Sequence, residues 1–155
     1  MEGINVMPKI LVCGKSCAVF AAGLRRALRR QNGGTASDFL IFTANTMPDG
    51  GEFDAVVVRG GVQPQCSSRM KVIIAEGTGY AGDGNTVTCG LGSGCDLSFS
   101  SACAGRLQVC LSRPLTGQNG RIEPCERSVR GTLGTAETVL AACALHFYFG
   151  TDGKN

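Results

Sequence analysis

The sequence predicts an α/β fold with a mainly parallel, open, Rossmann-like sheet flanked by helices, and with an antiparallel hairpin in its second half. In the first half, short apolar runs alternate with a helical pattern, which is typical of parallel sheets. In the second half, short strands separated by glycines lead to an Asn-Gly pair, a strong hairpin signal. A chain of 155 residues without repeat or linker suits a single α/β domain over residues 1–155.

The first half is predicted to hold four strands and one helix. Continuous apolar runs, typical of strands buried on both faces, predict strands at residues 9–13, 38–43, 53–59 and 70–75. Ser16 is placed to cap a helix that runs to about Arg30, with apolar residues at helical spacing. Four arginines lie toward its carboxyl end, where positive charge complements the helix dipole.

The second half is predicted to hold shorter strands at residues 86–89, 96–100 and 106–111. A hairpin turn is expected around residues 117–120, and its partner strand runs from Arg121 toward Val129. Pro124 confines this partner strand to a sheet edge, because proline cannot donate to a ladder. Glu123 and Glu126, among several arginines, make that edge either a rim that grips a ligand or partner, or a solvated, charge-blunted strand.

The chain closes with a predicted helix over residues 136–149. Thr135 is placed to cap it, Glu137 falls in its first turn and Gly150 ends it. The helix is apolar nearly all round, so we expect it to be buried. His146 shares a face with Val139 and Cys143, which favours a core histidine over a catalytic one.

Composition excludes several classes of function. A formal net charge of +3 is too small for the clustered basic face of a nucleic-acid-binding protein. No run approaches a membrane span, and the first residues lack the pattern of a signal peptide, so no membrane association is expected. Several of the nine cysteines, among them Cys13, Cys110 and Cys143, lie inside apolar runs. We therefore expect a reduced, cytoplasmic protein with mostly structural thiols.

The segment Gly14-Lys15-Ser16 follows the first strand and resembles the end of a phosphate-binding P-loop. A complete P-loop needs a glycine five residues before its Gly-Lys pair, and Lys9 occupies that position. What remains is a helix N-terminus with unpaired N–H groups and one lysine. The segment is therefore either an anion site or a structural turn.

A small ligand of an open α/β sheet lies at the carboxyl ends of the strands. Those ends fall at residues 14–17, 59–61 and 76–79. The candidate ligand-binding residues are Gly14, Lys15, Ser16, Arg59, Gly60, Gly77 and Thr78. Lys15 and Arg59 suit an anionic small molecule such as a nucleotide or a sugar phosphate, and no cofactor is indicated.

Cys17 is the candidate nucleophile of an alternative function, a small thiol-dependent enzyme. It falls in the first turn of the predicted helix, where the dipole stabilises a thiolate, and it forms a C-x-x-x-C pair with Cys13. No metal site is expected, because Cys89 and Cys95 lack a second pair and His146 is the single histidine. The third alternative is a pure protein-interaction module or homo-oligomer.

The second half resembles the later part of the central domain of the Mur ligase family. The matching stretches are residues 87–91, Asp96-Leu97, and residues 140–142 with Ala144, all within region 85–150, where the family has Tyr/Phe-Gly-Leu, Asp-Val and Asn-Ala-Leu-Ala-Ala. The resemblance implies an α/β nucleotide-domain core. The family's Gly-Thr-x-Gly-Lys-Thr loop, metal-site residues and C-terminal domain have no counterpart, and Thr138 replaces the helix asparagine. We therefore expect a non-catalytic binding or regulatory domain rather than an ATP-driven ligase.

Overall fold

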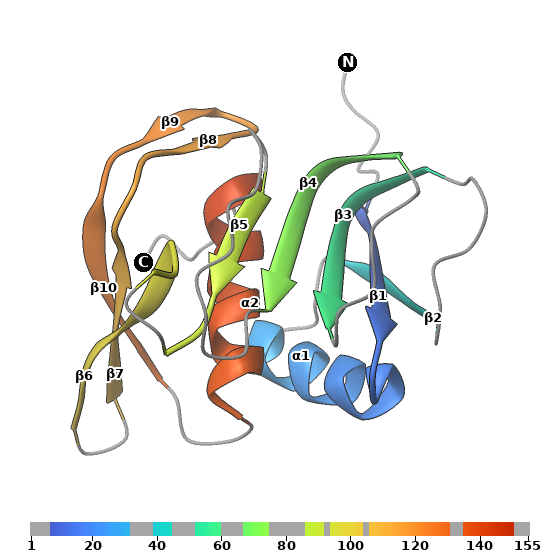
Figure 1. Cartoon of the computed structure of the whole chain (residues 1–155), viewed down its shortest axis with the longest axis horizontal. Helices are drawn as coiled ribbons and strands as arrows, with labels where there is room; N and C mark the ends of the chain where they lie inside the picture. The colour runs from blue at the N-terminus through green and yellow to red at the C-terminus, as the bar shows by residue number, and fades with distance from the viewer. Residues whose placement is uncertain are drawn as a thin grey trace.

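The computed structural model describes residues 7–31, 39–44, 52–59, 67–74, 86–91, 94–103, 106–130 and 135–150. Within these residues the chain forms one eight-stranded sheet, a separate two-stranded sheet and two helices (Figure 1). In chain order the elements are β1 (Lys9–Gly14), α1 (Cys17–Gln31), β2 (Leu40–Ala44), β3 (Glu52–Arg59), β4 (Ser67–Ile74), β5 (Thr86–Cys89), β6 (Leu97–Cys103), β7 (Arg106–Leu111), β8 (Leu115–Gly117), β9 (Gly120–Ile122), β10 (Cys125–Arg130) and α2 (Ala136–Phe149).

The strand order in the large sheet is β10-β7-β6-β5-β4-β3-β1-β2. The six neighbouring strands β6, β5, β4, β3, β1 and β2 are parallel to one another. At the other end of the sheet, β7 pairs antiparallel with β6, and β10 pairs antiparallel with β7. The predicted α/β fold with a mainly parallel sheet is therefore confirmed. Because β1 has β2 on one side and β3 on the other, the strand order reverses at β1/β3. This reversal is the topological switch point at which open sheets bind ligands.

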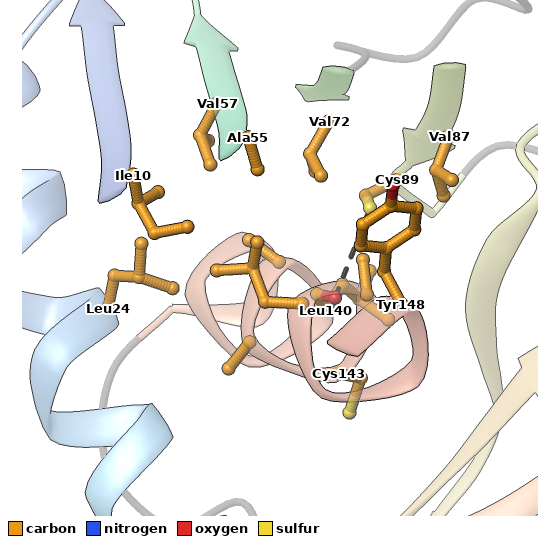
Figure 2. Close-up of a cluster of buried hydrophobic side chains, with 14 of the residues drawn as sticks. Ile10, Leu24, Ala55, Val57, Val72, Val87, Cys89, Leu140, Cys143 and Tyr148 are labelled. Carbon is orange, nitrogen blue, oxygen red and sulfur yellow. Dashed lines mark hydrogen bonds between the residues drawn. The ribbon is translucent and has the colours of Figure 1, made fainter. Parts of the chain in front are cut away.

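Both helices pack on the same face of the sheet. Alternate strand residues such as Ile10, Val57 and Val72 face α2, and Leu24 of α1 joins them (Figure 2). The helices contact each other where Gly23 lies against Thr138, whose Cγ2 would be 3.0 Å from a Cβ on the glycine. The predicted helices do flank the sheet, but both described helices lie on the same face of it.

The opposite face carries a second, smaller apolar cluster made by Leu11, Cys13, Val56 and Val58. These side chains are at most 3% exposed. Successive residues of a strand point to opposite faces, so β1 and β3 contribute to both clusters. The predicted burial on both faces is therefore confirmed for residues 10–13, whereas Lys9 at the start of the strand is exposed.

Helix α2 has the predicted caps and burial. The Thr135 hydroxyl accepts a hydrogen bond from the Thr138 N–H at 3.3 Å, and Gly150 ends the helix with a left-handed φ of 70°. Every residue from 138 to 149 is buried. The β8–β9 hairpin packs against this helix, and the Gln118 N–H donates to the Tyr148 carbonyl at 2.7 Å. The hairpin thereby satisfies a carbonyl in the last turn of α2.

The hairpin differs from the prediction in two details. Gly117 pairs with Gly120, so the turn residues are Gln118 and Asn119, and Gly120 carries the positive φ of +128°. The partner strand breaks at residues 123–124, and its second piece, β10, joins the edge of the large sheet. The edge position predicted from Pro124 is confirmed.

Cys110 of β7 is half-buried, because its side chain points away from the helices.

Candidate functional site

The predicted ligand-binding residues Gly14 and Arg59 meet at the switch point. They pair in the parallel register at the carboxyl ends of β1 and β3. Gly14 has a φ of +105°, and a Cβ there would lie 2.0 Å from the Arg59 carbonyl oxygen. Only glycine allows this close backbone approach, because any side chain would collide with the neighbouring strand.

The turn after Gly14 consists of two residues, Lys15 and Ser16, before α1 begins at Cys17. Lys9 begins β1, so the segment before the turn is a strand and not a glycine-rich arch. Ser16 precedes the helix as predicted, and its carbonyl accepts the Phe20 N–H at 3.0 Å. Its φ of +56° differs from the extended backbone of an ordinary N-cap residue. Strained backbone of this kind is concentrated at ligand sites.

The Arg59 side chain extends from β3 to the start of α1. Its Nη1 donates to the Lys15 carbonyl at 3.1 Å, and its guanidinium carbon lies 4.7 Å from the centroid of the Phe20 ring. Its Nε is buried without a hydrogen-bond partner among the described residues. Phe20 is the residue of this site that the sequence did not identify, because its role depends on a strand more than thirty positions away.

The charges at this end of the sheet favour an anion. Lys15 is exposed and Arg59 is partly exposed, so two positive side chains border the turn. The first turn of α1 carries no acidic residue, and the helix presents its positive dipole end there. The other candidates, Gly60, Gly77 and Thr78, lie outside the described residues.

The candidate nucleophile Cys17 lies in the hydrophobic core. It is 4% exposed and belongs to the helix-side cluster, whereas Cys13 belongs to the cluster on the opposite face of the sheet. The C-x-x-x-C spacing therefore reflects a strand and a helix that bury successive cysteines on different faces, and the burial of Cys17 favours a packing role over a reactive thiol.

Cys89 is a buried thiol at the end of β5, on the side of α2 that faces the sheet. Its Sγ lies 3.9 Å from the Leu140 carbonyl oxygen, to which it donates (Figure 2). Burial raises its pKa well above the ordinary value, and Cys143, Cys95 and Asp96 raise it further. No group of three His, Cys, Asp or Glu side chains within the described ranges is arranged to hold a metal ion. The arrangement supports protonated, structural thiols.

Asp96 joins three strands of the second half, a role that no local sequence pattern predicts. Its carboxylate accepts a hydrogen bond from the Thr88 N–H at 3.1 Å and another from Arg113 Nε at 2.5 Å. The Asp96 N–H in turn donates to the Thr88 hydroxyl. The Ser112 N–H donates to the Asp96 carbonyl at 2.8 Å. These bonds hold the ends of β5, β6 and β7 together.

His146 is 3% exposed, and its ring meets Phe39 edge to face with centroids 5.9 Å apart. Its burial confirms the interpretation of a core histidine. No helix in the described part of the chain has both the length and the apolar character needed to cross a membrane.

No protein-family model matches the chain, and neither a curated protein nor a solved structure matches it. The resemblance to the Mur ligase central domain therefore stays a prediction.

Proposed function

We propose that this protein is a non-catalytic, cytoplasmic binding or regulatory domain whose ligand is an anionic small molecule, a nucleotide or a sugar phosphate. The observation that carries the proposal is the meeting of Lys15 and Arg59 around the amino end of α1 at the β1/β3 switch point. The burial of thiols such as Cys89 supports structural cysteines, which suit a reducing compartment.

The site would hold a phosphate group by three elements. The first N–H groups of α1 lack intrahelical acceptors and point toward the turn. Lys15 supplies a mobile positive charge, and Arg59 supplies a planar donor that the Phe20 ring holds in place. The two-residue turn leaves no loop to enclose a triphosphate, so we expect a single phosphate or diphosphate to bind without ATP hydrolysis.

Kinship with the Mur ligase core remains part of the proposal. The stretches that carry the resemblance lie in β5, at the start of β6 and in α2, on the sheet and helix that form the core. The absence of a P-loop arch at the β1–α1 turn supports a relative that binds without ligase chemistry.

Thermal unfolding with nucleotides, UDP-sugars and inorganic phosphate tests the proposal. Ligand at about 100 times its dissociation constant should stabilise the folded state by about 2.7 kcal/mol. Lys15→Ala and Arg59→Ala should each reduce this stabilisation. Lys9→Ala is the matched control, because it removes the same charge at the opposite end of β1. Equal stabilisation of Lys15→Ala and Lys9→Ala, or no stabilisation by any anion, would contradict the proposal.

The thiol-enzyme alternative is less well supported, since Cys17 is buried. Reaction of the native protein with iodoacetamide separates the two functions. Slow labelling of Cys17 is the expected result, whereas rapid and selective labelling below neutral pH would favour the thiol enzyme.

A further inference from the structure

Strand β10 forms one outer edge of the eight-stranded sheet. It pairs with β7 on one side and has no strand on the other among the described residues, and it follows the margin of the molecule in Figure 1. Natural sheets blunt such edges with bulges, prolines and charged side chains, especially lysines. β10 has no bulge, proline or lysine over its six residues, and its register with β7 is continuous, but it carries Glu126, Arg127 and Arg130. Pairing at this edge therefore requires a partner strand that places opposite charges against Glu126 and Arg130.

The backbone groups that point outward from β10 can be identified from its neighbours. The Ser112 N–H donates to the Asp96 carbonyl directly opposite, so even-numbered residues of β7 point their backbone groups toward β6. The Ser100 hydroxyl bond to the Gln108 carbonyl agrees with this. Odd-numbered residues of β7 therefore bond to the odd-numbered residues of β10. The N–H and C=O groups of Glu126, Ser128 and Arg130 remain to face outward.

These three residues are self-complementary under a twofold rotation. When two copies of β10 run antiparallel with Ser128 opposite Ser128, Glu126 of each copy lies directly opposite Arg130 of the other. Centring the pair on Glu126 or Arg130 would instead oppose like charges, which is unfavourable. Centring it on Arg127 would place Arg127 opposite Arg127 of the second copy, which again opposes like charges. Among these registers, the one centred on Ser128 satisfies the backbone and also places opposite charges together.

The charges within one copy also favour an acidic neighbour. In the register of β7 with β10, Arg130 at the end of β10 lies opposite Arg106 at the start of β7, so two basic residues occupy neighbouring positions there. Arg106 uses Nη1 to reach the Ser128 hydroxyl at 3.2 Å, and Glu126 accepts from Gln108 at 3.4 Å near the other end. A second copy would bring its Glu126 beside the basic pair.

We propose that this protein forms a homodimer through β10, whose outward edge pairs antiparallel with β10 of a second copy about a twofold axis at Ser128. Backbone hydrogen bonds from Glu126, Ser128 and Arg130 join the two sheets into one continuous sheet. The Glu126–Arg130 pairs at both ends of the contact set the register.

Charge reversal tests this interface by sedimentation velocity over a range of concentrations. Glu126→Arg and Arg130→Glu should each weaken dimerisation at least about tenfold, because each changes two opposite-charge pairs into like-charge pairs. The double variant that carries both changes should return to within about threefold of the wild type. Glu123→Arg is the control, since it makes the same charge change on an exposed residue outside β10 and should leave the dimer intact.

A backbone variant tests the strand pairing itself. Ser128→Pro removes an outward N–H without removing a bond to β7, so a folded monomer is expected, with folding checked by circular dichroism. A wild-type protein that stays monomeric at millimolar concentration would overturn the proposal. So would a dimer that persists in Glu126→Arg, or a double variant that fails to recover, because either outcome assigns the contact to another surface or register.

Discussion

Two arginines show how a single side chain gains its role from its surroundings. Arg113, itself largely exposed, pairs with Asp96, which is 6% exposed and also holds the Thr88 N–H. Arg59 bonds to the Lys15 carbonyl and stacks on Phe20, which leaves its positive charge beside the amino end of α1. The first arginine stabilises the fold, whereas the second is available to a ligand.

Removal of the Asp96 carboxylate should destabilise the protein. We expect Asp96→Ala to lower the free energy of unfolding by about 2 kcal/mol, because the buried Thr88 N–H loses its acceptor and Arg113 its partner. Glu123→Ala is the matched control, since its pair with Arg121 is exposed at both ends and should contribute less than about 1 kcal/mol. Urea unfolding of both variants measures the difference. Equal losses would show that Asp96 acts only as a surface charge.

The buried Cys89 thiol should make stability depend on pH in the alkaline range. Burial raises its pKa in the folded state above the ordinary value of 9.0. Above about pH 9 the unfolded chain therefore binds fewer protons than the folded one, and stability falls as the pH rises toward the folded pKa. The slope for one proton is about 1.4 kcal/mol per pH unit. Cys89→Ser should lose less stability than the wild type between pH 8 and pH 10 in urea unfolding, whereas identical losses would contradict the account.

At the scale of elements, the site depends on how closely β1 approaches β3. Gly14→Ala should destabilise the protein by about 2–4 kcal/mol, since it adds backbone strain and places a Cβ against the Arg59 carbonyl. Gly120→Ala separates the two causes, because Gly120 also has a positive φ but no atom within 4 Å of its added Cβ. Thermal unfolding should show a clearly smaller loss for Gly120→Ala. A similar loss in both variants would mean that strain alone accounts for the effect.

Local sequence patterns predict most of the helices and strands of this fold, but not every contact between them. Strands, helices, caps and the edge position of β10 follow from local patterns such as the apolar run at residues 9–13 and Pro124. Lys15 and Arg59 were identified because parallel strands end at one edge of a sheet. Phe20 and Asp96 were missed, because their partners are distant in the sequence and depend on register. The placement of both helices on one face has no local signal either.

At the scale of the whole molecule, the two proposed surfaces lie far apart in the strand order. The anion site falls at β1/β3, near one end of the sheet, and the dimer edge is β10 at the other. Four strands, β4 through β7, separate β3 from β10. Pairing at β10 would therefore leave the switch point accessible in both copies, and one dimer would carry two independent sites.

An anionic ligand is proposed to bind at the amino end of α1. Titration of ¹⁵N-labelled protein with a nucleoside diphosphate or UDP-sugar, followed by backbone amide chemical shifts, tests it most directly. We expect the largest shifts at Lys15, Ser16, Ala18 and Val19, and we expect them to saturate, with weaker binding in Lys15→Ala. Shifts centred on β10 or the β8–β9 hairpin, or no saturable shifts with any anion, would contradict it.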